Sequence, residues 1–109
     1  VDRIKELILT GGFNVHPSEV EAALRRIPGV RDAAAFGLAS PRHGEEVAAA
    51  VVLTPDAGLN AGDLREAVRH DLPAYAVPRR VVIVEDLPRS LLGKVLRRQV
   101  RKEFESRAS

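Results

Sequence analysis

Pairs of turn-forming residues divide this chain of 109 residues into short apolar segments. Their spacing limits the length of the helices and strands that the chain can form. Glycine and proline are the strongest local breakers of regular structure, especially as neighbours or next to Ser and Thr. Four such pairs bound the main segments: Gly11-Gly12, Pro28-Gly29, Ser40-Pro41 and Thr54-Pro55. The pattern therefore predicts short strands and helices that follow one another closely.

Four of the segments are predicted to be strands. A brief strand at Leu7–Leu9 stops at the glycine pair and feeds a flexible loop. Longer strands are expected over 30–38 and 47–53. The alanines at 48–50 resemble a helix, but the run is short, is bounded by turn residues and finishes in Val51-Val52-Leu53. Residues 81–84, Val-Val-Ile-Val, indicate a buried strand.

Three segments carry helical spacing. The first opens at Pro17, with Ser18 and Glu21 at the spacing of a capping box. Asn60 or Asp63 is expected to cap the second. The apolar positions that recur on one face are Val20, Ala23, Leu24 and Ile27 in the first, Leu64, Ala67, Val68 and Leu72 in the second, and Leu96, Val100 and Phe104 in the third.

The predicted order is therefore strand, helix, two strands, helix, strand and helix, with neighbouring strands antiparallel. This order indicates an α+β domain with a sheet of about three strands, a short N-terminal strand pair region and flanking helices. A length of 109 residues fits one domain.

Composition excludes several classes of protein. Without cysteine the chain has no disulfide framework and no thiolate nucleophile, and we expect a cytoplasmic location. His16, His43 and His70 lack the spacing of a metal site, so no metal ligands are predicted. No apolar run approaches the ~20 residues of a membrane span, and no signal peptide opens the chain. A net charge of +2 gives no reason to expect nucleic-acid binding.

A lysine at the start of the third helix is the first candidate for chemistry. The stretch 87–98, Leu-Pro-Arg-Ser-Leu-Leu-Gly-Lys-Val-Leu-Arg-Arg, has Pro88 and Gly93 at turn positions and then enters the helical pattern. Lys94 therefore lies where a loop meets a helix, near unpaired backbone N–H groups, and is well placed to meet an anion.

A second motif lies at the other end, over residues 2–21, Asp-Arg-Ile-Lys-Glu-Leu-Ile-Leu-Thr-Gly-Gly-Phe-Asn-Val-His-Pro-Ser-Glu-Val-Glu. It resembles the hinge and first helix of the acyl- and aryl-CoA synthetases in the adenylate-forming, AMP-binding superfamily. The Leu-Pro-Arg segment ending in Gly93-Lys94 resembles that superfamily's last motif. The resemblance covers essentially the whole chain but only the small C-terminal domain of such an enzyme.

The resemblance implies that residues 1–109 form a single C-terminal lid domain with a hinge near residues 2–6. A chain that begins at Val1 without an initiating Met is expected to be a piece of a longer polypeptide, whose large N-terminal AMP-binding domain is absent here. That domain would be the lid's main partner. The isolated lid is expected to be inactive.

The implied function is ATP-dependent ligation of a carboxylic acid, with fatty acids favoured, to CoA through an acyl-adenylate. ATP, Mg²⁺ and CoA are then the substrates and cofactors. By resemblance, Lys94 is the catalytic lysine that bridges the carboxylate and the α-phosphate, Arg3 contacts the ATP, and Lys5 is the hinge residue, whose role is backbone torsion.

The same resemblance makes Gly11, Gly12, Phe13 and Asn14 a loop that lines the CoA tunnel in the second half-reaction. Two glycines permit positive φ and backbone close to a ligand. Phe13 replaces a Glu common in relatives, so a role based on charge is not carried over to this position.

Three alternatives stay open. The first is an adenylation domain that loads a carrier protein, and the second is a small basic module that binds nucleic acid through the helix at 97–102. The third is a purely structural interaction domain. Several basic residues fit either CoA phosphates or solvated helix faces, and singly each favours the solvated face: Arg65, Arg69, Arg97, Arg98, Arg101 and Lys102.

Overall fold

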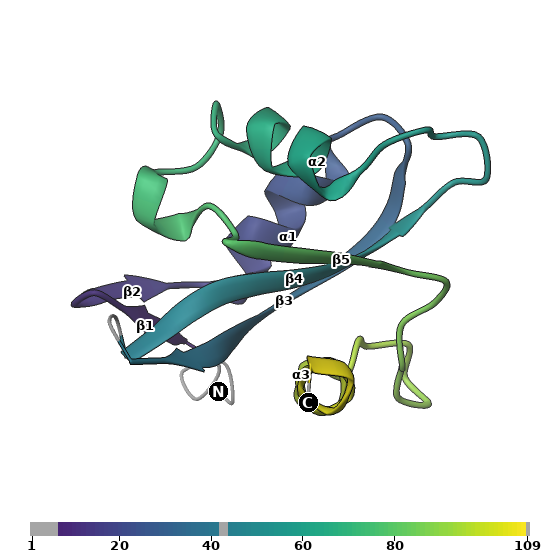
Figure 1. Cartoon of the computed structure of the whole chain (residues 1–109). Coiled ribbons are helices and arrows are strands. Elements are labelled where there is room, and N and C mark those ends of the chain that lie inside the picture. Colours follow the sequence, from purple (N-terminus) through teal and green to yellow (C-terminus); the bar gives the residue numbers. More distant parts are fainter. Residues whose placement is uncertain (1–6, 42–43, 109) are drawn as a thin grey trace.

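The computed structural model describes residues 7–41 and 44–108 (Figure 1). The elements follow the order β1 (Ile8–Thr10), β2 (Phe13–Val15), α1 (Pro17–Arg25), β3 (Val30–Ser40), β4 (Gly44–Leu53), α2 (Ala61–Val68), a 3-10 turn η2 (Ala74–Ala76), β5 (Arg80–Val84) and α3 (Arg97–Ala108). The predicted α+β class is confirmed, and the N-terminal strand pair is a hairpin within the same sheet as the longer strands.

One five-stranded sheet forms the middle layer of the described part of the chain. Its order is β2-β1-β4-β3, and β5 pairs with β4 on the side away from β3. The β3 and β4 strands run antiparallel from Val30 opposite Leu53 to Ser40 opposite Gly44. β3 is therefore an edge strand, and its outer backbone groups need partners from elsewhere.

Helices cover both faces of this sheet. Alternate residues of β3 and β4 face opposite ways: Ala33, Ala35, Val47, Ala49 and Val51 pack with α1 and α2, whereas Ala34, Phe36, Ala48, Ala50 and Val52 pack with Leu87 and with Val100 of α3. Figure 1 shows α1 and α2 on one side and α3 on the other. Burial on both faces explains why these strands are continuously apolar. No helix in the described residues is long and apolar enough to cross a membrane.

Two expectations about the last strand are wrong. β5 pairs with β4 in parallel, from Ala48 opposite Arg80 to Val52 opposite Val84. The connection from β4 to β5 contains α2, which gives it the length that a parallel crossover requires. β5 is also only half-buried, and Ile83 is 41% exposed, because this strand lies at the edge of the sheet beyond β4.

One predicted helix cap is confirmed and the other is wrong. At α2, the Asn60 side chain accepts a hydrogen bond from the Asp63 N–H, and the Asp63 carboxylate accepts one from the Asn60 N–H. At α1, His16 is the N-cap residue and Pro17 begins the helix, so Ser18 and Glu21 make no capping box. The Glu21 side chain instead points into the protein, where it is buried.

Candidate functional site

The segment Pro88–Leu96, here named the lysine loop, is closed into a compact unit by its own backbone. Arg89 and Val95 form an antiparallel bridge. The Ser90 N–H donates to the Lys94 carbonyl at 2.8 Å, and the Leu96 N–H donates to the Pro88 carbonyl at 2.9 Å. The loop therefore turns back on itself before α3 begins at Arg97.

Ser90 and Gly93 shape the tip of the lysine loop. The Ser90 Oγ accepts hydrogen bonds from the backbone N–H groups of Leu92 at 3.2 Å and Lys94 at 3.3 Å. Gly93 has a φ of 87°, a backbone conformation that residues other than glycine rarely adopt. Together, these features form a tight turn of the backbone immediately before Lys94.

The Lys94 side chain is exposed, and the described residues offer it no ion-pair partner. No carboxylate of the described residues lies within 4.0 Å of its ammonium, whereas other basic side chains nearby are paired. The adjacent Leu91 and Leu92 are also exposed, at 107% and 87%. An ammonium on a long, flexible stem, flanked by apolar side chains, is suited to meet an anionic group on another surface.

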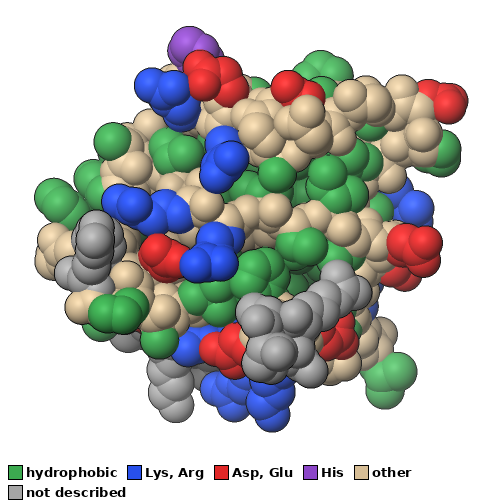
Figure 2. Space-filling model, in the orientation of Figure 1, with side chains coloured by type: hydrophobic (Ala, Val, Ile, Leu, Met, Phe, Trp, Pro, Cys, Tyr) green, Lys and Arg blue, Asp and Glu red, His purple; other side chains and the backbone are tan. Residues whose placement is uncertain are grey.

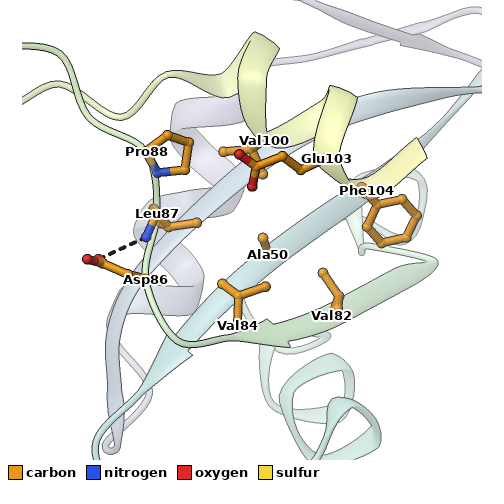
Figure 3. Close-up of a pocket in the computed structure, with 9 residues that line it drawn as sticks. All are labelled: Ala50, Val82, Val84, Asp86, Leu87, Pro88, Val100, Glu103 and Phe104. Carbon is orange, nitrogen blue, oxygen red and sulfur yellow. Dashed lines mark hydrogen bonds between the residues drawn. The ribbon is translucent and has the colours of Figure 1, made fainter. Parts of the chain in front are cut away.

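The base of the lysine loop is anchored in the core between the sheet and α3. Leu87 is 5% exposed, and its backbone N–H donates a hydrogen bond to the Asp86 carboxylate at 2.9 Å (Figure 3). A cavity of about 20 Å³ lies here, lined by residues that include Ala50, Val84 and Val100. Small-molecule sites measure about 300–1,000 Å³, so this gap is a feature of packing.

Ion pairs across the β3 edge connect the lysine loop and α3 to the rest of the domain. Arg97, the first residue of α3, donates to Glu21 of α1 through Nε and Nη2, both at 2.6 Å, and the Ala35 N–H donates to the same carboxylate at 2.8 Å. Arg89 pairs with Asp32, which also accepts from Arg25 at 3.0 Å. These ion pairs neutralise the buried carboxylates and supply hydrogen-bond partners to backbone groups of the edge strand β3.

Sequence reasoning missed the role of Arg97, because a basic residue on a charged helix is usually solvated. A signal for it existed in the first helix. Glu21 lies at the same spacing as the buried residues Pro17, Val20 and Leu24, so it occupies a core position of an otherwise apolar helix face. A buried carboxylate needs a cationic partner.

The residues predicted to form the CoA-tunnel loop are the turn and second strand of a hairpin. Gly11 and Gly12, with φ values of 55° and 85°, form a two-residue turn between Thr10 and Phe13. Phe13 and Asn14 belong to β2, and the Phe13 ring stacks on Tyr75 with 4.2 Å between centroids. Both rings remain about half exposed, at 50% and 42%.

The lysine loop and the β1–β2 hairpin lie at opposite ends of the sheet (Figure 1). The structure therefore does not bring Lys94 together with Gly11–Asn14. The two other predicted site residues, Arg3 and Lys5, lie outside the described residues, as does His43. Within the described ranges, no three His, Asp or Glu side chains are grouped in a way that could hold a metal ion.

On the face shown in Figure 2, basic side chains are interspersed with acidic ones. Arg69 pairs with Glu66 at 2.9 Å, Arg80 with Glu46 at 2.9 Å and Arg101 with Glu105 at 3.2 Å. Arg65 donates to the Arg79 carbonyl at 3.1 Å. A module that binds nucleic acid would present a basic stripe, so this arrangement does not favour that alternative.

Gly93→Ala is expected to lower any activity of the intact protein that requires Lys94. A Cβ at Gly93 meets nothing within 4 Å, so its cost is that of the backbone conformation alone, about 1–2 kcal/mol. The alanine backbone relieves this strain by moving away from the positive φ, and that movement shifts the lysine loop. We expect a loss of up to about tenfold in such an activity, measured in the intact protein.

Gly58→Ala is the matched control for this variant. Gly58 also has a positive φ, 65°, with open space around its Cβ position, but it precedes α2. The two variants should lose similar stability in thermal unfolding, and only Gly93→Ala should lose activity. Equal losses of activity would show that the conformation of the lysine loop has no special importance.

Known proteins resemble this chain over most of its length. The model of the AMP-binding enzyme C-terminal domain family matches residues 19–94. A ligase of Mycobacterium tuberculosis, 3-[(3aS,4S,7aS)-7a-methyl-1,5-dioxo-octahydro-1H-inden-4-yl]propanoyl:CoA ligase, is 43% identical over 92% of this chain and 20% of its own. The long-chain-fatty-acid–CoA ligase of Escherichia coli O6:H1 is 43% identical over 94% of this chain and 18% of its own.

A solved structure agrees with these sequence matches. The Mycobacterium tuberculosis fatty acyl CoA synthetase superposes with a TM-score of 0.89 and 33% identity, over 95% of this chain and 20% of that one. The chain thus spans about one fifth of the length of the proteins that it matches. The match over residues 19–94, together with the shared fold, shows that this chain belongs to the AMP-binding enzyme C-terminal domain family.

Proposed function

We propose that this chain is the C-terminal lid of an ATP-dependent acyl-CoA ligase. In this proposal residues 1–109 form one domain, with a hinge near residues 2–6 and Lys5 as the hinge residue. A larger AMP-binding domain, earlier in the same polypeptide, holds most of the ATP and the acid. The CoA ligases among the relatives support an acid–thiol ligase, and their differing acids are consistent with an acid pocket outside this chain.

In the first half-reaction, a carboxylate oxygen attacks the α-phosphorus of Mg²⁺-ATP. The bond from that phosphorus to the bridging oxygen of the β-phosphate breaks, and pyrophosphate leaves. Two negatively charged groups must approach each other in this step. The Lys94 ammonium lies between them and lowers their repulsion, and Arg3 contacts the nucleotide. Lys94 is exposed and has no carboxylate partner among the described residues, which supports this role.

In the second half-reaction, the CoA sulfur attacks the acyl carbon, the thiol proton is lost and AMP leaves. The lid rotates about its hinge and presents the hairpin tip, Gly11, Gly12, Phe13 and Asn14, to the pantetheine tunnel. The glycine turn lets backbone approach a ligand closely, and the exposed Phe13 ring offers an apolar surface.

The observation that carries the proposal is the placement of the lysine loop and the glycine hairpin at different ends of the domain. The lysine loop and the glycine hairpin lie at opposite ends of one sheet (Figure 1), and this separation supports a lid whose two ends meet the active site at different times. A rigid lid that serves two half-reactions must therefore present its ends in turn.

The test is an assay of the enzyme that carries this domain with a panel of carboxylic acids and Mg²⁺-ATP. We expect release of pyrophosphate, followed by thioester formation and AMP release when CoA is added. The 109-residue chain alone should do neither. Acyl transfer only to a phosphopantetheinylated carrier protein would favour the alternative of a carrier-loading adenylation domain, and absence of adenylate formation with every acid would contradict the proposal.

A further inference from the structure

The Arg89 side chain connects Gly93, the residue before Lys94, to strand β3 of the sheet. Its Nη1 donates to the Gly93 carbonyl at 2.8 Å, and its Nη2 pairs with the carboxylate of Asp32 on β3. The first contact lies within the lysine loop, and the second crosses to a separate element. Arg89 is therefore a bridge between the backbone that carries Lys94 and the edge of the sheet.

Asp32 is a fixed partner for this bridge. Its side chain is 12% exposed, and one of its oxygens accepts hydrogen bonds from the Ala33 N–H at 2.8 Å and from Arg25 Nη2 at 3.0 Å. The Arg25 guanidinium also donates to the Ala33 carbonyl at 3.0 Å. A carboxylate held by its own strand and by α1 cannot follow the lysine loop if that loop moves.

The remaining contacts of the lysine loop leave its orientation partly open. The Arg89–Val95 bridge and the Ser90 hydrogen bonds hold the loop together, but they do not fix it relative to the sheet. Leu87 and Val100 anchor the two ends through apolar packing, which has little directionality. Two directional pairs near Lys94 reach other elements: Arg89–Asp32 and, at the start of α3, Arg97–Glu21. Of these two, the Arg89 pair also holds the backbone next to Lys94, through the bond from Arg89 to the Gly93 carbonyl.

We propose that Arg89 and Asp32 are positioning residues that hold the lysine loop in the orientation needed for adenylate formation. The inference rests on the role of Lys94 in the proposed function. The Arg89 side chain is 44% exposed, so loss of its guanidinium should cost the fold little stability, although Asp32 is only 12% exposed. The effect of that loss on catalysis is larger, because a displacement of about 1 Å at a reacting group can cost about 100-fold in rate.

The test uses the full enzyme with Arg89→Gln, Asp32→Asn and the double variant. Single-turnover acyl-adenylate formation and thioester formation from supplied acyl-adenylate are measured separately. Each single variant should lose about 10- to 100-fold in adenylate formation, with thioester formation within about twofold and a melting temperature lower by no more than a few degrees. In adenylate formation, the double variant should be no worse than the worse single variant, because each single variant already breaks the Arg89–Asp32 contact.

Three further variants make the outcome specific. Arg89→Lys keeps the charge and should restore part of the loss. Arg101→Gln removes a different arginine, which pairs with Glu105 on the same helix and with Glu45 of β4, and should leave both steps unchanged. Lys94→Ala is measured in parallel: if it retains adenylate formation, the proposed function fails, and if it loses that step while Arg89→Gln and Asp32→Asn do not, only the positioning inference fails.

Two other results would overturn the inference. A loss confined to Arg89→Gln, with Asp32→Asn fully active, would mean that the Arg89 guanidinium acts directly on substrate. Equal losses in both half-reactions would mean that the pair supports the fold in general and has no specific effect on Lys94.

Discussion

Lys94→Ala is expected to lower the rate of acyl-adenylate formation by about 100- to 1,000-fold in the enzyme that carries this domain. The reason is electrostatic. In the proposed mechanism, loss of the ammonium leaves the carboxylate and the α-phosphate to repel each other in a site closed to water, where a single aligned cation has a large effect. Thioester formation from supplied acyl-adenylate should change by no more than about twofold, since the proposed mechanism uses Lys94 only in adenylate formation.

The control for Lys94→Ala is Lys102→Ala, which removes an exposed lysine from α3. This variant should leave both half-reactions unchanged. Lys94→Arg should recover only part of the adenylation rate, because the planar guanidinium differs in shape and hydration from a compact ammonium. Equal loss of both half-reactions in Lys94→Ala would contradict the assignment and indicate general damage.

Arg97→Leu is expected to destabilise the chain by about 3–5 kcal/mol, a large part of the stability of an ordinary domain. The Glu21 side chain is only 3% exposed, and Arg97 supplies two hydrogen bonds of 2.6 Å to it. Removal of the guanidinium leaves a buried carboxylate with the Ala35 N–H but without a full counter-charge. Equilibrium unfolding in urea, followed by circular dichroism, measures the loss.

Two comparisons make this stability prediction specific. Arg69→Leu breaks an ion pair whose side chains are 64% and 66% exposed, so it should cost about 1 kcal/mol or less. Adding Glu21→Gln to Arg97→Leu should restore part of the stability, because the amide oxygen still accepts from Ala35 and no charge is buried. A loss below about 1 kcal/mol for Arg97→Leu would mean that water screens the Glu21 carboxylate.

Local pattern was enough to predict most of the elements. The glycine and proline pairs mark the ends of β1, α1, β3 and β4, and Asn60 caps α2 as its residue type indicates. The alanines at 48–50 lie in a strand because both faces of β4 are covered, a tertiary effect that overrides their helix propensity. The parallel pairing of β5 depends on which sheet edge is free, and local sequence does not encode that.

The candidate site was predictable in part. The turn at Gly93 and the exposure of Lys94 follow from the local sequence. The contacts that hold the loop do not, because Arg89 finds Asp32, and Arg97 finds Glu21, across large separations in sequence. Only the folded sheet edge brings these charges together. The acidic residue on the apolar face of α1 was the one local sign of such a partner.

The most direct measurement is a crystal structure of the enzyme that carries this domain, trapped with Mg²⁺-ATP and an unreactive analogue of its acid before CoA is added. The account predicts that the Lys94 Nζ lies within about 3 Å of an oxygen of the α-phosphate and of the carboxylate. A Lys94 side chain left in solvent, with another cation between those two groups, would contradict it.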